Sequence, residues 1–231
     1  MINVIRFLGC GSAFNPLMGN TSAYFKKGDN LFLIDAGETV FSELFKRKLL
    51  AESENIYVLI THTHGDHVGS LPSILSYTYY VLGKKVTIVY PDKSLIQLLD
   101  LMGISRDIYK IITDKTVSIE NVLIQAVEVK HEENIKCFGY ILDICGKKIY
   151  YSGDSYEIPV IVEKEFIAGN ISEIYQDTTE FSSDRPSHCP LDVLEKTFPE
   201  ETRKNIFCMH FSNDFLEKLE EKGFNYVQID K

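Results

Sequence analysis

The sequence lacks paired cysteines, long apolar runs and an excess of basic residues. Its five cysteines form no C-x-x-C pair, and most are flanked by apolar residues, as buried free thiols are. No apolar run approaches the roughly 18 residues that a membrane-spanning helix needs. Residues 2–8 have the pattern of a strand rather than that of a secretory signal. These features predict a cytoplasmic protein without a membrane segment.

Acidic residues outnumber basic ones, 33 to 24, which gives a formal net charge of −9 and a pI near 5.2. A protein that binds a long phosphate backbone usually presents a basic face, so this balance argues against a large nucleic-acid partner. The 231 residues, 45% of them apolar, can bury a sizeable core. No Pro/Ser-rich linker or low-complexity tract interrupts them, which predicts one domain over residues 1–231.

The apolar pattern predicts alternating strands and helices. The predicted strands cover residues 2–8, 21–26, 30–36, 56–60, 85–90, 117–130 (two runs), 172–176 and 205–209, with a hairpin over 138–151 that turns at Cys145-Gly146. The predicted helices cover residues 39–49, 67–81, 92–102, 189–197 and 213–221. Strands followed by helices in two halves suggest two packed sheets with helices outside, an α/β fold.

Half of the six histidines occur in one short segment, Thr-His-Thr-His-Gly-Asp-His, which begins at Thr61. It supplies four metal-ligand side chains: His62, His64, Asp66 and His67. Histidines two apart in an extended segment point the same way, and a turn at Gly65, where no Cβ is present, would bring the last two ligands to the opposite side. This spacing suits two ions side by side better than one. The alternative is a polar loop with unrelated histidines.

Further candidate ligands lie downstream at the ends of predicted strands: His131, Asp154 and His210. Each has an ordinary alternative when taken alone. His131 could be a solvated residue before two glutamates, Asp154 a turn residue in Ser-Gly-Asp-Ser, and His210 a core histidine. A dinuclear site needs ligands beyond the first segment, so these residues complete it. Imidazole and carboxylate donors without cysteine favour zinc-like or manganese-like ions.

These motifs resemble the metallo-β-lactamase fold superfamily. Residues 61–72 are similar to its signature loop, and Phe7-Leu-Gly-Cys-Gly-Ser-Ala, Leu33-Ile-Asp-Ala-Gly-Glu and Met209-His210-Phe211-Ser212 look most like its tRNA 3′-processing endonuclease (RNase Z) branch. The resemblance implies a four-layer αβ/βα sandwich with a dinuclear metal site at one edge of the two sheets.

The resemblance also implies how the ligands divide between two divalent ions, zinc or alternatively manganese. The first ion would be held by His62, His64 and His131. The second would be held by Asp66, His67 and His210. Asp154 would bridge both, and a homodimer is implied as well.

One departure from RNase Z concerns the substrate. RNase Z enzymes carry a long basic arm between the third histidine and the bridging aspartate, whereas only 22 residues separate His131 from Asp154 here. Small relatives without the arm include the anti-Pycsar phosphodiesterases, which this chain resembles in its size and its opening Leu-Gly-Cys-Gly-Ser-Ala-Phe. The resemblance implies hydrolysis of 3′,5′-cyclic nucleotides such as cCMP, cUMP, cAMP and cGMP to nucleoside 5′-monophosphates, in evasion of anti-phage signalling.

Three other functions stay open: a tRNA 3′-processing endonuclease without the usual arm, a lactonase or thioesterase, and a non-catalytic metal-binding module. The predicted mechanism for the phosphodiesterase is attack by a hydroxide that bridges two ions roughly 3.5–4 Å apart. Asp66 would ligate and orient this hydroxide. His188, the histidine not needed as a ligand, would protonate the leaving oxygen, unless it is a solvated helix-start residue. By analogy with RNase Z, Asp177 would orient His188.

The substrate-binding residues are not identified by the sequence. Tyr77, Tyr79 and Tyr80 are candidates for stacking on a nucleobase, although aromatic residues at this spacing are more often part of a core or a subunit interface. The expected partner is a small cyclic nucleotide, with no long nucleic acid and no membrane.

Overall fold

The computed structural model describes residues 4–184 and 187–230. Its strands form two sheets, one with six strands in the order β1-β2-β3-β4-β5-β6 and one with seven in the order β13-β12-β11-β10-β9-β8-β7. The first sheet consists of β1 (Arg6–Gly9), β2 (Ser22–Lys27), β3 (Asn30–Ile34), β4 (Asn55–Leu59), β5 (Val86–Val89) and β6 (Tyr109–Ile112). The second consists of β7 (Thr116–Ile119), β8 (Val122–Val129), β9 (Cys137–Ile144), β10 (Lys147–Tyr151), β11 (Glu173–Asp177), β12 (Ile206–Met209) and β13 (Asn225–Tyr226).

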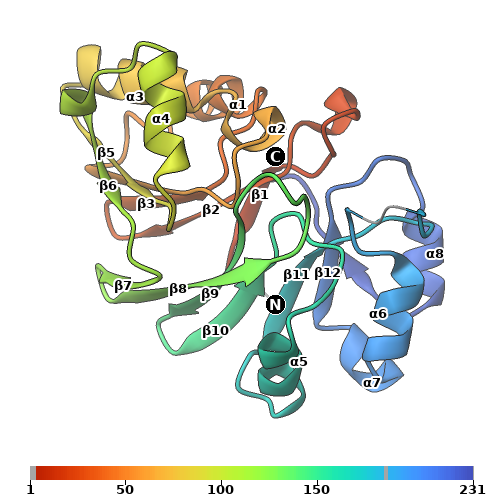
Figure 1. Cartoon of the computed structure of the whole chain (residues 1–231). Coiled ribbons are helices and arrows are strands. Elements are labelled where there is room, and N and C mark those ends of the chain that lie inside the picture. Colours follow the sequence, from red (N-terminus) through yellow and green to blue (C-terminus); the bar gives the residue numbers. More distant parts are fainter. Residues whose placement is uncertain (1–3, 185–186, 231) are drawn as a thin grey trace.

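Helices cover the outer faces of both sheets (Figure 1). The first sheet carries α1 (Val40–Lys46), α2 (Gly65–Val68), α3 (Leu71–Tyr80) and α4 (Ser94–Leu101), with short 3-10 turns at η1 (Pro16–Met18) and η2 (Arg106–Ile108). The second carries α5 (Val160–Ile167), α6 (Leu191–Thr197), α7 (Glu200–Arg203) and α8 (Leu216–Glu221). The layers therefore run helix, sheet, sheet, helix, which confirms the predicted α/β sandwich. Among the described helices, none is long and apolar enough to cross a lipid bilayer.

The core lies on both faces of the central strands. Leu31, Phe32, Leu33 and Ile34 of β3 are all fully buried, because helices pack on one face of the sheet and the second sheet on the other. The two sheets are also joined by Tyr140 of β9. Its hydroxyl donates to the backbone carbonyl of Ile60 at 2.7 Å and lies 3.1 Å from the carbonyl oxygen of Val89, at the ends of β4 and β5.

Strand direction brings distant segments to one edge. β10, β11 and β12 are parallel, and β8 runs the same way as β10 because both pair antiparallel with β9. Their carboxyl ends therefore meet at the same edge of the second sheet. His131 follows β8, Asp154 follows β10 and His210 follows β12, while the segment that begins at Thr61 follows β4 of the first sheet.

Most predicted elements are confirmed, including the 138–151 hairpin, whose turn residues Cys145 and Gly146 both have positive φ angles. The continuous helix predicted over 67–81 is wrong. It is divided into α2 and α3 at Gly69-Ser70, because Pro72 in the first turn of α3 has no amide hydrogen to continue the helix from α2. The sequence pattern also missed β6 and α5. Val160, Ile161 and Ile167 of α5 are exposed, so this helix has no clean apolar stripe.

Replacing Tyr140 with phenylalanine tests the link between the sheets. Tyr140→Phe leaves the buried Ile60 carbonyl without this donor, which is expected to lower the free energy of unfolding by about 1–3 kcal/mol in urea titrations. Tyr150→Phe is the matched control: Tyr150 is also fully buried, but its hydroxyl makes no hydrogen bond within the described chain. Equal destabilisation by both substitutions would contradict a specific role for the Tyr140 hydrogen bond.

Candidate metal centre

The structure divides the predicted ligands into two groups that meet at Asp154. In the first, Nε2 of His62 lies 3.0 Å from Nδ1 of His64, which in turn lies 3.2 Å from Nε2 of His131. Oδ2 of Asp154 lies 3.8 Å from Nε2 of His62 and 3.7 Å from Nε2 of His131. These four side chains have the spacing of a cluster that could hold one ion.

The second group lies on the other side of the same carboxylate. Oδ2 of Asp66 lies 3.3 Å from Nε2 of His67 and 3.2 Å from Nε2 of His210. Oδ1 of Asp154 lies 3.2 Å from Nε2 of His67 and 3.5 Å from Nε2 of His210. One carboxylate oxygen of Asp154 thus faces each group.

The donor atoms fit divalent ions. Four ligands about 2.1 Å from a zinc ion in a tetrahedron lie about 3.4 Å from one another, close to the spacings within the second group. Nε2 of His67 and Oδ1 of Asp154 are buried, and neither makes a hydrogen bond within the described residues. Buried polar atoms without partners are unfavourable, and a cation between these two atoms would satisfy both.

The surroundings of the histidines shift their pKa values in opposite directions in the two groups. Burial opposes protonation of His210, but the negative charge of Asp154 raises the pKa of its imidazole to about 10. Burial likewise opposes protonation of His67, and the charges of Asp154 and Asp35 raise its pKa well above the ordinary value. Burial lowers the pKa of His62, so that imidazole stays neutral and available as a ligand. Metal binding at the second group would therefore release protons.

Asp35 supports this centre, and the sequence analysis assigned it no role. It is fully buried after β3, and its Oδ2 lies 2.8 Å from Nδ1 of His67. It also accepts hydrogen bonds from the backbone N–H and the hydroxyl of Thr61, both at 2.8 Å. A carboxylate on the far nitrogen of a ligating histidine fixes the tautomer and the orientation of the ring. The position of Asp35 directly after an apolar strand, within Ile-Asp-Ala-Gly, was the available signal.

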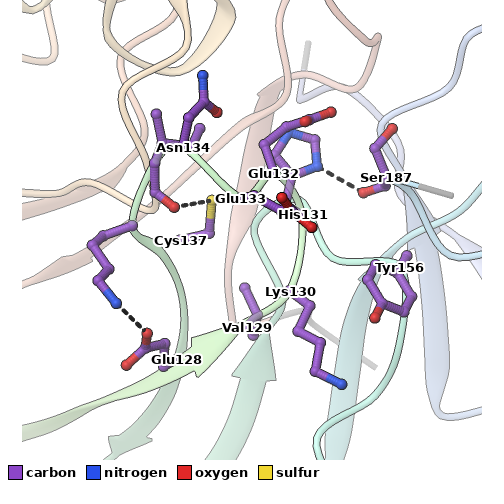
Figure 2. Close-up of a pocket in the computed structure, with 12 residues that line it drawn as sticks. Glu128, Val129, Lys130, His131, Glu132, Glu133, Asn134, Cys137, Tyr156 and Ser187 are labelled. Atoms are coloured by element: carbon purple, nitrogen blue, oxygen red, sulfur yellow. Dashed lines mark hydrogen bonds and ion pairs between the residues drawn. The ribbon is translucent and has the colours of Figure 1, made fainter. Parts of the chain in front are cut away.

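His131 is oriented from outside in the same way. Its Nδ1 lies 2.7 Å from the backbone carbonyl oxygen of Ser187, so Nδ1 donates and Nε2 faces the first group (Figure 2). The side chain of His188 is partly accessible, with 27% of it exposed. Its Nδ1 lies 2.7 Å from Oδ2 of the buried Asp177, as the predicted orienting pair requires. Against the effect of burial, the charge of Asp177 raises the pKa of His188.

Two cavities open at this edge. One of about 690 Å³ is lined by candidate ligands of both groups together with His188 and residues 12–14. The other, of about 760 Å³, lies beyond the loop that carries His131 and is lined by Glu132, Glu133 and Tyr156 among others (Figure 2). His131, Glu132 and Ser187 line both cavities, so the two adjoin.

The three tyrosines suggested for base stacking do not line the cavity that contains the candidate ligands. Tyr77 packs edge-on against Phe41 and Phe45 with ring centroids 5.6 Å apart in each pair, and Tyr79 contacts Tyr80. Tyr77 is therefore a packing residue, which is the alternative to base stacking that the sequence left open. The aromatic side chain that does line the cavity is Phe14, which the sequence analysis did not single out.

The glycine that the loop requires is also different from the predicted one. Gly65 begins α2, and a Cβ there would meet only the Glu38 carboxylate at an ordinary 3.4 Å, so the expected need for glycine at this position is wrong. A Cβ on Gly37 would instead collide with the backbone of Asp66. Residues 35–37 pack directly on the segment of residues 61–67, since the Ala36 N–H donates to the His67 carbonyl at 2.7 Å.

A pair of alanine substitutions tests this contact. Gly37→Ala must displace the backbone of Asp66, which is expected to cost about 1–3 kcal/mol of stability and to reduce the rise in melting temperature on adding Zn²⁺. Gly65→Ala, which lies directly before Asp66 but makes no collision, is expected to leave both quantities unchanged. A Gly37→Ala variant with the stability and zinc response of the unmodified protein would refute the close packing.

Comparison with known proteins identifies the family. A family model described as "Anti-Pycsar protein Apyc1" matches residues 3–228. The anti-Pycsar protein Apyc1 of Bacillus phage BSP38 is 30% identical over 246 aligned positions, which cover 95% of this chain and 93% of that protein. A ribonuclease Z of Parabacteroides distasonis is 28% identical, but the match covers 71% of this chain and 58% of that enzyme.

The fold is shared with solved structures. The metallo-β-lactamase fold protein YhfI from Bacillus subtilis superposes with a TM-score of 0.75 at 17% identity, over 98% of this chain and 95% of that one. The resemblances to the metallo-β-lactamase fold and to the anti-Pycsar proteins are therefore confirmed. The protein has the metallo-β-lactamase fold and belongs to the anti-Pycsar protein Apyc1 family.

Proposed function

We propose that this protein is a metal-dependent phosphodiesterase that hydrolyses 3′,5′-cyclic nucleotides to nucleoside 5′-monophosphates. The observation that carries the proposal is the position of Asp154, whose two carboxylate oxygens each face one cluster of histidine nitrogens. Two cation sites that share one carboxylate suit displacement at phosphorus, where charge on the attacking and leaving oxygens needs compensation. Membership of the Apyc1 family supports this chemistry.

A small substrate is supported by the surroundings of the centre. The segment between His131 and Asp154 is filled by the β9–β10 hairpin, in which all of β10 pairs with residues 140–144 of β9. The adjoining cavity exposes Glu132 and Glu133, which have no ion-pair partner within the described residues. Carboxylates at this place repel a long polyanion, whereas a cyclic nucleotide carries a single phosphate charge.

The proposed division of the residues between two ions is the one that the resemblance implies. His62, His64 and His131 would hold one, Asp66, His67 and His210 the other, with Asp154 shared. When bound, divalent ions lower the pKa of a ligated water and offset negative charge on the phosphate. Zinc is the proposed ion, with manganese as the alternative, since all donors are imidazole or carboxylate. Asp66, which faces the cavity between the groups, would orient the attacking water.

His188 would supply the proton for the leaving group. Water adds to phosphorus and loses a proton to solvent, the bond from phosphorus to the 3′-oxygen breaks, and that oxygen takes a proton from His188. Asp177 holds Nδ1, so Nε2 is the nitrogen left for the substrate. The raised pKa of His188 keeps a larger fraction of the imidazole protonated near neutral pH, which suits a general acid.

Turnover of a substrate panel tests the proposal. The metal-loaded protein, with its metal content measured, is expected to hold two ions per chain and to convert cCMP, cUMP, cAMP or cGMP to 5′-monophosphates. Precursor tRNA, a lactone and a thioester serve as parallel substrates. Cleavage of tRNA with cyclic nucleotides intact would instead identify a processing nuclease, a possibility kept open by the similarity to ribonuclease Z. No turnover of any substrate would favour a binding module.

The role of His188 makes a separate prediction. His188→Ala is expected to bind metal normally but to lose about 10²–10⁴-fold in kcat with a cyclic nucleotide. A nucleoside 5′-(p-nitrophenyl phosphate) provides the control, because p-nitrophenolate leaves without a proton. Its turnover should fall by less than about tenfold, the smaller effect expected when no general acid is needed. Equal losses with both substrates would assign His188 to binding or structure rather than to proton transfer.

A further inference from the structure

We infer that Phe14 is the residue on which the nucleobase of the substrate stacks. This inference rests on the proposed function, because it takes a nucleotide as the ligand of the cavity. A single exposed apolar side chain is common on protein surfaces, so exposure alone has no weight. Three features of Phe14 together carry the inference: its cavity, the hydrogen bonds that close its loop and the contrast with its neighbour Leu17.

The cavity comes first. The ring of Phe14 lines the same space as both candidate metal groups and His188, and it is the only phenylalanine, tyrosine or tryptophan among the described residues that do so. The remaining wall is polar, with histidines, carboxylates and serines. A phosphate at the metal groups and a base against an aromatic ring would then occupy one continuous cavity of about 690 Å³, within the usual size of ligand pockets.

Hydrogen bonds fix the backbone of the loop that carries Phe14. Its backbone is closed by hydrogen bonds from Cys10 N–H to the Met18 carbonyl at 3.1 Å and from Gly11 N–H to the Gly19 carbonyl at 2.8 Å. The carbonyl of Phe211 accepts from the Ser12 N–H and from the Asn15 side chain, both at 3.1 Å. Phe211 directly follows His210. The loop that presents Phe14 is therefore tied to the segment of a candidate metal ligand.

A loop whose backbone is already fixed loses little conformational entropy when its aromatic side chain binds a flat partner. The loop nevertheless leaves Phe14 96% exposed, so the ring contributes almost nothing to the core. A nucleobase offers an aromatic face of matching shape, and stacking on an aromatic side chain is worth about 1–3 kcal/mol per base.

Leu17 provides the contrast. It lies in the same loop and is also 96% exposed, but it lines a different hollow, beside Thr39 and Lys46, that contains no candidate ligand. Both side chains are thus equally exposed, but of the two only Phe14 lines the cavity that contains the candidate ligands. This makes Leu17 a matched control for any effect of substitution in the loop.

Fluorescence gives a direct test, because the chain contains no tryptophan. In the metal-loaded Phe14→Trp variant, AMP is expected to quench the emission of the single indole, whereas ribose 5-phosphate, which has the phosphate but no base, is not. In Leu17→Trp neither ligand should change the emission. Equal responses of the two variants to AMP would overturn the inference, as would binding of AMP by the unmodified protein no tighter than binding of ribose 5-phosphate.

Kinetics give the second readout. Phe14→Ala is expected to raise KM for cyclic AMP by about 5- to 150-fold with little change in kcat, the fold-change that corresponds to the loss of one stacked base. Ribose 3′,5′-cyclic phosphate, which lacks a base, should show the same KM in both proteins, and Leu17→Ala should behave like the unmodified protein. Equal loss with both substrates would overturn the stacking role.

The two proposals can fail separately. If the unmodified protein hydrolyses no cyclic nucleotide but AMP quenches the emission of Phe14→Trp and not that of Leu17→Trp, the proposed phosphodiesterase activity is wrong and base stacking at Phe14 is supported. If cyclic nucleotides are hydrolysed with the KM unchanged in Phe14→Ala, base stacking at Phe14 is wrong and the phosphodiesterase activity is supported. Light scattering tests whether a second copy of the chain, rather than a nucleobase, contacts Phe14. A lower molecular mass for Phe14→Ala than for Leu17→Ala would assign the ring to a contact between subunits and overturn the inference.

Discussion

The carboxylate of Asp154 is almost fully buried, and the loops around it are arranged so that its charge is compensated. Five histidines have a ring nitrogen 3.2–3.8 Å from one of its oxygens: His62, His67, His131, His188 and His210. An ionised carboxylate without such partners would be very unfavourable in the interior. These histidines come from both sheets, so the site exists only when the sheets are packed together. The inter-sheet hydrogen bond of Tyr140 is part of the same requirement.

The backbone around the centre is strained at two buried residues. Asp35 and His210 both have positive φ angles, 63° and 67°, a conformation that residues other than glycine adopt rarely and at a cost on the order of 1–3 kcal/mol. Each is held by its surroundings. The Asp35 N–H donates to the Leu59 carbonyl at 2.8 Å, and the residue after His210 pairs with the loop that begins at Cys10. In this conformation the Asp35 side chain contacts His67, a candidate ligand, and the His210 side chain points into the second group of candidate ligands.

The surroundings of the centre differ in character from one side to the other. The cavity beyond His131 is lined by charged side chains of both signs, among them Glu132, Glu133 and Lys130, while a hydrogen-bonded loop presents Phe14 to the cavity of the candidate ligands. A small anion with an aromatic portion fits this arrangement, because its phosphate would lie between the histidines and its flat ring would lie against Phe14. In the proposed reaction, orientation of His188 by Asp177 completes the set of roles.

The local sequence determined the ligand types and most elements, because strand alternation, the spacing of His62, His64 and His67, and turn residues such as Cys145-Gly146 act over a few positions. The α/β class and the family resemblance followed from the same motifs. Only the tertiary structure decided that Asp35 orients His67, that Gly37 rather than Gly65 must lack a side chain, and that Phe14 rather than the tyrosines of α3 lines the cavity. These facts depend on contacts between segments that are far apart in the sequence, and a local pattern contains no information about which residues approach each other across two sheets.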